Sequence, residues 1–164
     1  MKQDERGSGG RLQSVLFVCT ANIFRSVTAE YALKIRLGAD SSCVVSSAGI
    51  DVKPQAMHHW VQSRLRAKGA DPTTHVQRQL TGEMLKTADL VMAMGRDHQI
   101  FIREEFGLDV PLFNQVCLGQ DEPILDLHEV MPEWRTDPEQ ARAYVWSVMD
   151  RIWATAPTLL SRLL

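Results

Sequence analysis

The sequence lacks the features that mark several common classes of protein. Lys and Arg (18) do not outnumber Asp and Glu (20) among its 164 residues, so a formal charge of −2 provides no basic excess for a nucleic-acid backbone. No apolar run approaches the roughly 18 to 20 residues that a membrane-spanning helix needs. We therefore expect no nucleic-acid partner, no membrane insertion and a cytoplasmic location.

Cysteine is also scarce. Cys19, Cys43 and Cys117 are odd in number and far apart, which suits neither a disulfide framework nor a zinc site with closely paired ligands. The adjacent His58 and His59 would diverge by about 100° on a helix and form a poor chelate. We expect no metal and no cofactor, and we expect one cysteine with a special environment.

The two ends of the sequence differ in composition from its middle. Residues 1–11 are polar and rich in glycine, and such a segment buries too little apolar surface to offset its ordering entropy, so it is predicted to be a disordered tail. With 45% hydrophobic residues overall, the remaining 12–164 are predicted to fold as a single domain.

Strand and helix patterns alternate along this domain. The predicted strands cover residues 14–19, 43–47, 89–94 and 110–113, and the predicted helices lie around residues 29–37, 57–65, 81–87, 100–104 and 141–153. This alternation predicts a three-layer α/β fold, with a parallel sheet of about four strands and helices on both faces. Such sheets bind ligands at the carboxyl ends of their strands, and Cys19 ends the first one.

The loop after the first strand carries the chemistry. Cys19 and Arg25 flank five residues between a buried strand and a helix start, where backbone N–H groups and the helix N-terminus favour an anion. The positive potential of these N–H groups and of the helix N-terminus also favours a thiolate at Cys19. The planar guanidinium of Arg25 matches two phosphate oxygens. Ser26 can donate to a leaving thiolate, and Asn22 tolerates left-handed backbone. These residues predict a phosphatase that forms a cysteinyl-phosphate. The residues expected to bind phosphate are Thr20, Ala21, Asn22, Ile23, Phe24, Arg25 and Ser26.

Residues 18–26, followed by Ala29 and Glu30, resemble the signature of the low-molecular-weight protein tyrosine phosphatases. Further landmarks resemble that family in the right order, namely residues 47–49, His75 and residues 88–94. The resemblance implies a phosphatase fold, hydrolysis of phosphotyrosine in a protein substrate, and a monomer or weak homodimer.

The resemblance also implies a hydrogen-bond network that holds the loop in shape. Its members would be Asn22, Ser26, Ser47 and His75.

Three positions of the loop region depart from the family pattern. Ala21 stands where glycine is usual, Phe24 where a second cysteine is frequent, and Val27 where proline is usual. Phe24 removes the thiol that many relatives can pair with the nucleophile under oxidation. Ile23 resembles the tyrosine-directed members, whereas arginine-phosphate phosphatases of this fold tend to have threonine there.

A phosphatase for tyrosine also needs a general acid, because a leaving group with a pKa near 10 departs more easily with a proton supplied. In the family this is an aspartate, usually followed by proline, after the fourth strand. The candidates are Asp121, Asp126, Glu133 and Asp137.

Asp137 is followed by Pro138 but directly precedes a strong helix, which is the pattern of an N-cap with proline at the first helical position. Asp126, about a dozen residues past the predicted strand end, is therefore our assignment. Trp134 or His128 would line the wall that receives the substrate ring.

Two other functions remain open. An arsenate reductase of the same fold would need two resolving cysteines around the third strand, and residues 80–112 contain none. A non-catalytic module that binds phosphorylated partners through the intact loop would be excluded by turnover that depends on Cys19.

Overall fold

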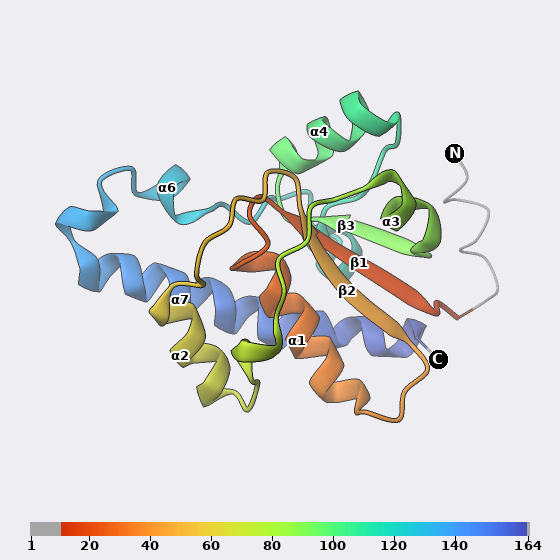
Figure 1. Cartoon of the computed structure of the whole chain (residues 1–164), viewed down its shortest axis with the longest axis horizontal. Helices are drawn as coiled ribbons and strands as arrows, with labels where there is room; N and C mark the ends of the chain where they lie inside the picture. The colour runs from red at the N-terminus through yellow and green to blue at the C-terminus, as the bar shows by residue number, and fades with distance from the viewer. Residues whose placement is uncertain (1–10, 164) are drawn as a thin grey trace.

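A parallel sheet of three strands, in the order β2-β1-β3, lies at the centre of the residues that the computed structural model describes, 11–163 (Figure 1). The strands are β1 (Ser14–Cys19), β2 (Val44–Gly49) and β3 (Leu90–Ala93). In the register of the sheet Cys19 lies opposite Gly49, so the carboxyl ends of β1 and β2 meet at the predicted nucleophile.

Helices surround this sheet. The α-helices are α1 (Arg25–Leu37), α2 (His59–Ala67), α3 (Gly82–Thr87), α4 (Arg96–Phe106), α5 (Phe113–Leu118), α6 (Leu127–Val130) and α7 (Pro138–Thr155). Three 3-10 helices are η1 (Pro72–Thr74), η2 (Trp134–Thr136) and η3 (Ala156–Arg162).

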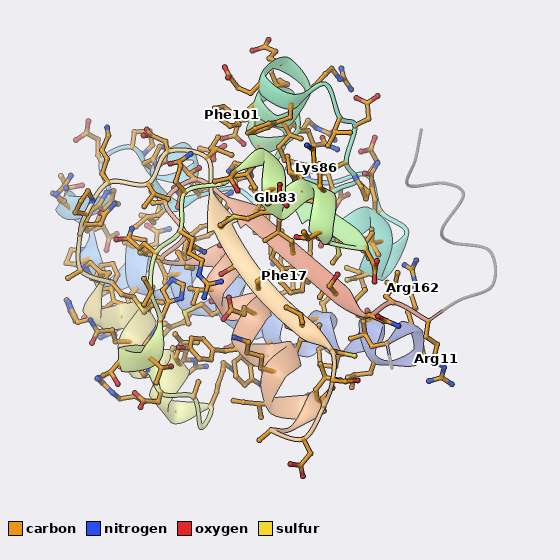
Figure 2. The ribbon with its side chains drawn as sticks, turned by 45° about the vertical axis from the view of Figure 1, so that its right-hand side comes forward. Arg11, Phe17, Glu83, Lys86, Phe101 and Arg162 are labelled. Atoms are coloured by element: carbon orange, nitrogen blue, oxygen red, sulfur yellow. The ribbon has the colours of Figure 1, made fainter. Side chains whose placement is uncertain are left out.

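The central strand is apolar on both faces because both faces are covered. Val15 and Phe17 pack in a core with α1, α7 and η3, whereas Leu16 and Val18 pack in a second core with α3 and α4. Figure 1 shows these two groups of helices on opposite sides of the sheet, and Figure 2 shows Phe17 at its centre. The prediction of an α/β fold with helices on both faces is therefore confirmed.

A third core fixes α2 against the rest of the molecule. It joins Tyr31 of α1 and Leu65 of α2 to Val145 and Met149 of α7. Because α7 follows α6 in the chain, this packing brings the last third of the sequence to the carboxyl end of β1.

The prediction of a fourth strand over residues 110–113 is wrong. Among residues 11–163 it pairs through a single bridge between Leu112 and Ala93, in which the Ala93 N–H donates to the Pro111 carbonyl at 2.9 Å. Pro111 has no N–H to extend the ladder, and the Leu112 N–H donates instead to Gln115 Oε1 at 2.8 Å. Phe113 then begins α5, which the sequence analysis did not predict.

Residues 1–10, most of the predicted disordered tail, lie outside the described residues. The Leu12 N–H donates to the Arg162 carbonyl at 2.7 Å, and Figure 2 shows Arg11 and Arg162 at the same end of the molecule. That 12–164 form a single domain stays a prediction.

Between residues 11 and 163 no helix has the length and apolarity to cross a membrane. Within the same range no group of three or more His, Cys, Asp or Glu side chains could hold a metal ion.

Candidate active site

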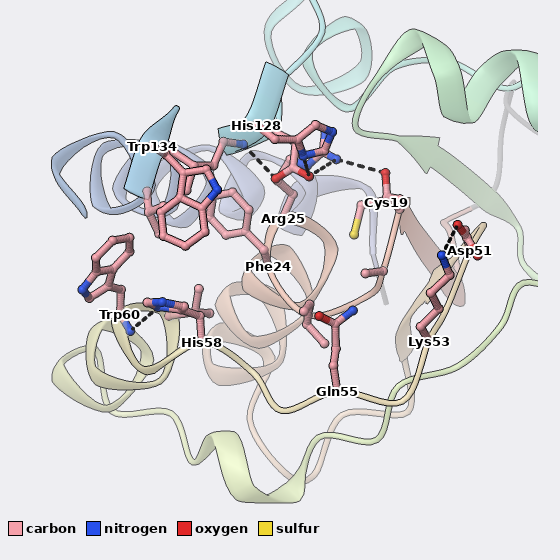
Figure 3. A pocket seen from close by; sticks show the side chains of 17 residues that line it. Cys19, Phe24, Arg25, Asp51, Lys53, Gln55, His58, Trp60, His128 and Trp134 are labelled. Atoms are coloured by element: carbon pink, nitrogen blue, oxygen red, sulfur yellow. Dashed lines mark hydrogen bonds and ion pairs between the residues drawn. The ribbon is translucent and has the colours of Figure 1, made fainter. Parts of the chain in front are cut away.

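A pocket of about 360 Å³ opens at the carboxyl end of β1, with Cys19 among its lining residues (Figure 3). Three separate parts of the chain line it: the loop after β1, the segment from the end of β2 into the first turn of α2, and residues from the start of α6 to α7. Cys19 itself is only 2% exposed. The fold therefore places the predicted nucleophile at the base of a cavity rather than on the surface.

The loop after β1 has backbone donors without protein acceptors. Within the described chain, no backbone or side-chain acceptor receives the N–H groups of Thr20–Phe24. Asn22 adopts a left-handed conformation (φ 60°), which turns the chain sharply. Successive free N–H groups in such a turn form a concave site suited to a tetrahedral anion.

Gly49 allows this loop to pack closely on the end of β2. A Cβ at Gly49 would lie 2.5 Å from the Thr20 carbonyl oxygen and 3.0 Å from the Asn22 nitrogen. Only glycine fits there without moving the loop.

A chain of hydrogen bonds from residues of α1 and β2 supports the loop. Asn22 Nδ2–H donates to Ser26 Oγ at 3.0 Å and to Ser47 Oγ at 2.8 Å, and the Ser47 hydroxyl donates to Glu30 Oε1 at 2.7 Å. Ser26 Oγ lies 2.9 Å from Cys19 Sγ, and when Cys19 is a thiolate, which can only accept, the Ser26 hydroxyl donates to the sulfur. A hydrogen bond donated to sulfur stabilises the thiolate.

The outer side of the loop has two further supports. His75 Nε2–H donates to the Asn22 carbonyl at 2.6 Å, and the Asn22 side-chain oxygen accepts from the Arg78 N–H at 3.0 Å. The structure thus brings together all four residues of the expected network, Asn22, Ser26, Ser47 and His75.

Arg25 is almost completely buried beside the nucleophile, at 1% exposed. Its Nη1 donates to the Ile124 carbonyl at 2.6 Å, its Nη2 donates to Thr20 Oγ1 at 3.3 Å, and Nη2 lies 3.8 Å from Asp126 Oδ2. Its Nε is buried with no hydrogen-bond partner among the described residues. Both terminal nitrogens of Arg25 are therefore held by protein, while its Nε–H is left for a bound anion.

Asp126 is the acid candidate that lines the pocket. It caps the start of α6, where its Oδ1 accepts from the Leu127 N–H at 2.8 Å and its Oδ2 lies 3.1 Å from His128 Nδ1. The carboxylate therefore lies between α6 and Arg25. Because residue 127 is leucine and not proline, its backbone N–H is available for this capping bond.

The other three acid candidates do not line the pocket. Asp137 caps α7 by accepting from the Gln140 N–H at 3.2 Å, with Pro138 at the first helical position. Asp121 is exposed and pairs with Arg96 at 3.1 Å. Glu133 is exposed at the start of η2.

Aromatic side chains form one wall of the pocket. Trp134 of η2 contacts Trp60 and His58, with ring centroids 5.9 and 6.1 Å apart, and Phe24 and His128 line the same cavity (Figure 3). These rings lie on one side of the cavity that contains Cys19 and are suited to stack on a flat substrate group.

The prediction that the side chains of His58 and His59 diverge is wrong. Their rings stack at 4.3 Å between centroids, because His58 is the N-cap of α2 with extended backbone rather than part of the helix. Burial, followed by the neighbouring His59, lowers the pKa of His58.

Two buried polar residues near the loop were given no role by the sequence analysis, although Glu30 was named as part of the signature. Glu30 ends the hydrogen-bond chain, and its position four residues after Ser26 on α1 is a signal that could have placed it on the same helix face. His98 lies 2.9 Å from Thr20 Oγ1, but it is 78 residues distant in the chain, so no local pattern points to it.

This arrangement defines an α/β protein with a cysteine and a buried arginine framing an anion site at the end of the central strand. The model of the family described as low molecular weight phosphotyrosine protein phosphatase matches residues 14–114, which is more than half of the chain. The chain belongs to this family.

Curated relatives include two kinds of phosphatase. The chain is 36% identical over 96 residues to the protein-arginine-phosphatase of Bacillus subtilis (strain 168), covering 57% of this chain and 63% of that protein. It is 32% identical over 95 residues to the low molecular weight protein-tyrosine-phosphatase Ptp of Acinetobacter johnsonii, covering 57% of this chain and 65% of that protein. The chain thus spans less than two thirds of the length of these relatives.

The fold is similar over a longer stretch. The solved low molecular weight protein tyrosine phosphatase of T. tengcongensis aligns with a TM-score of 0.75 and 24% identity, covering 92% of this chain and 99% of that one.

Proposed function

We propose that this chain is a phosphatase that hydrolyses phosphotyrosine in protein substrates through a cysteinyl-phosphate intermediate. The observation that carries the proposal is a buried arginine, Arg25, whose Nε has no protein partner and which shares a pocket with Cys19. Buried polar atoms nearly always have a partner, so the missing one is expected to be an oxygen of the substrate phosphate. Membership of the family supports the same chemistry.

In the first step the Cys19 thiolate attacks the phosphorus atom in line with the bond to the tyrosine oxygen. The S–P bond forms while the P–O bond to tyrosine breaks, and the three other phosphate oxygens are bound by Arg25 and the loop N–H groups. Asp126 gives its proton to the departing phenolate, which would otherwise be a poor leaving group.

In the second step a water molecule attacks the phosphorus of the cysteinyl-phosphate. The Asp126 carboxylate accepts the proton of that water, the S–P bond breaks, and inorganic phosphate is released. Ser26 donates a hydrogen bond to the Cys19 thiolate as it leaves. Both groups then return to their starting protonation states.

The proposal is tested by turnover of p-nitrophenyl phosphate. We expect Cys19→Ser to abolish turnover, and Arg25→Lys to lower kcat/KM by about a thousandfold or more, because an arginine on the transferred phosphoryl group contributes roughly 10³ to 10⁵ in rate. Cys117→Ser is the matched control, since burial raises the pKa of this thiol to about 11 and leaves it an inert thiol. Unchanged turnover in Cys19→Ser would exclude the mechanism, and no turnover in the wild type would favour a non-catalytic phosphate-binding module.

Two features support phosphotyrosine over phosphoarginine. The pocket wall is aromatic, with Trp134 and Phe24 placed to pack on a phenyl ring, and the loop has the apolar Ile23 where arginine-directed members tend to have threonine. We expect kcat/KM on a phosphotyrosine peptide to exceed that on the matching phosphoarginine peptide, and Ile23→Thr to narrow the difference. A preference for phosphoarginine would overturn the substrate assignment and leave the cysteine chemistry in place.

An arsenate reductase would need two resolving thiols close to the nucleophile, and neither Cys43 nor Cys117 lines the pocket that holds Cys19. The raised pKa of Cys117 disfavours the thiolate that a resolving step requires. A cytoplasmic location and a monomeric or weakly dimeric state stay predictions.

A further inference from the structure

His98 is a buried histidine that the proposed reaction does not use. It lies in the first turn of α4 with no exposed surface. A fully buried imidazole needs a partner for each nitrogen, and both partners are present.

The two hydrogen bonds fix the tautomer of this ring. Nδ1 accepts from the Gly95 N–H at 2.9 Å, so Nδ1 carries no hydrogen, and the hydrogen of a neutral ring must be on Nε2. Nε2 lies 2.9 Å from Thr20 Oγ1, within hydrogen-bond distance, while Asp97 Oδ2 is further away at 3.6 Å. His98 therefore donates to Thr20.

The charges around His98 favour the neutral ring. Burial lowers its pKa to about 4, and Arg25 of α1 adds to this effect. Asp97 of α4 and Asp126 at the start of α6 act in the opposite direction but do not cancel it. The ring stays neutral throughout the range in which the enzyme would work.

Thr20 then has both oxygen lone pairs in use. One accepts from His98 Nε2–H, and the other accepts from Arg25 Nη2–H at 3.3 Å. The single hydroxyl hydrogen of Thr20 must point away from both donors, and Thr20 lines the pocket together with Cys19.

We propose that His98 is a positioning residue that fixes the rotation of the Thr20 hydroxyl, so that this hydroxyl donates into the pocket to an oxygen of the bound phosphoryl group. The inference rests on the proposed function for its role in turnover. A donor whose direction is set before the reaction stabilises charge on the phosphoryl oxygens without reorganising. His98 would thereby extend the anion site beyond the residues that touch the substrate.

Two substitutions separate this role from a structural one. The side-chain oxygen of asparagine can take the place of Nδ1 and keep the bond from Gly95, but its amide does not reach Thr20. The amide nitrogen of glutamine can take the place of Nε2 and keep the donor to Thr20, but not the acceptor for Gly95. We therefore expect His98→Gln to lower the stability of the fold, and His98→Asn to release the Thr20 hydroxyl.

The test measures kcat/KM for p-nitrophenyl phosphate in the full chain. We expect His98→Asn to lower it about tenfold, the scale of one lost hydrogen bond, and His98→Gln to stay within about threefold of the wild type. Thr20→Val should also cost about tenfold, and His98→Asn should add nothing in that background. An active His98→Asn with an inactive His98→Gln, or a full tenfold loss on top of Thr20→Val, would overturn the inference.

A binding measurement keeps this test separate from the proposed reaction. In the Cys19→Ser background, where no turnover is expected, we expect calorimetry to show weaker binding of inorganic phosphate for His98→Asn than for His98→Gln. Equal phosphate affinity in both variants would refute the positioning role even for a chain that catalyses nothing. Nitrogen NMR of His98 should show the Nε2–H tautomer between pH 6 and 8, and a proton on Nδ1 would contradict it.

Discussion

At the scale of single residues, the direction of each hydrogen bond determines what the site can do. Glu30 can only accept, so Ser47 must donate to it, and Ser47 in turn accepts from Asn22. The same amide donates to Ser26, which leaves the Ser26 hydrogen for the Cys19 thiolate. One buried carboxylate, four links from the nucleophile, thereby orients the donor that stabilises the thiolate.

The acid assignment leads to a prediction at this scale. We expect Asp126→Asn to lower kcat/KM for phenyl phosphate by about 10²-fold or more, because a general acid contributes roughly 10² to 10⁴ to such a step. For p-nitrophenyl phosphate, whose leaving group needs less help from a proton, the loss should be under about tenfold. Asparagine is also a good N-cap, so the start of α6 is retained.

Asp137→Asn is the matched control, since both changes replace a helix-capping aspartate by asparagine. It should leave kcat/KM unchanged for both substrates. An equal loss on both substrates in Asp126→Asn, or a loss on phenyl phosphate in Asp137→Asn, would show that the acid is assigned wrongly.

At the scale of helices and strands, the sequence predicted what depends on neighbouring residues. The apolar period of α7 and the cap at Asp137 are local patterns, and both occur in the structure. The four-residue helix α6 has no apolar period, so no local pattern predicted it. It is recognised only in the structure, where Asp126 caps its start. The prediction of a fourth strand was wrong because a local pattern was present but misleading. The apolar run suggested a strand, but Pro111 has no N–H with which to continue the hydrogen-bond ladder.

The junction of α2 and α7 leads to a prediction about pH. Hydrogen bonds from Arg64, at 2.6 and 3.0 Å, and then from Lys68 lower the pKa of Asp150 to about 2. Because the folded-state pKa lies below the ordinary value of 3.8, the stabilisation is present above about pH 4 and is lost as the pH falls towards 2. The carboxylate is partly exposed, so solvent screening limits the contribution to about 1 kcal/mol.

Urea unfolding at pH 6 and at pH 3 measures this contribution. The free energy of unfolding of Asp150→Asn should fall about 1 kcal/mol below the wild type at pH 6, and the difference should shrink at pH 3. Asp40→Asn is the control, because Asp40 is an exposed carboxylate with no ion-pair partner among residues 11–163. A difference that stays constant between the two pH values would contradict the role of Asp150.

At the scale of the whole molecule, local residue patterns predicted the site only where its parts are close in the chain, whereas the family resemblance was needed to name the distant Ser47, His75 and Asp126. Cys19, Arg25 and Ser26 lie at the two ends of one short loop, and their spacing pointed to an anion site. Ile124 and His98 reach the same site from distant elements, and Ile124 is held there by its N–H, which donates to the Met94 carbonyl just after β3 at 2.8 Å. Long-range packing of this kind leaves no periodic trace in a sequence.

The assembly of the site from distant segments predicts that an anion stabilises the entire fold. Phosphate in the pocket would bind the loop after β1 and Arg25, which holds the Ile124 carbonyl from the last third of the chain. At a phosphate concentration of about 100 times Kd the folded state gains about 2.7 kcal/mol, which corresponds to a rise in Tm of about 5 to 10 °C for a domain of this size. Differential scanning calorimetry with potassium chloride at matched ionic strength measures the shift. Cys19→Ser and Asp137→Asn should retain it and Arg25→Lys should lose most of it, whereas an equal shift in chloride would show that ionic strength, and not the pocket, stabilises the fold.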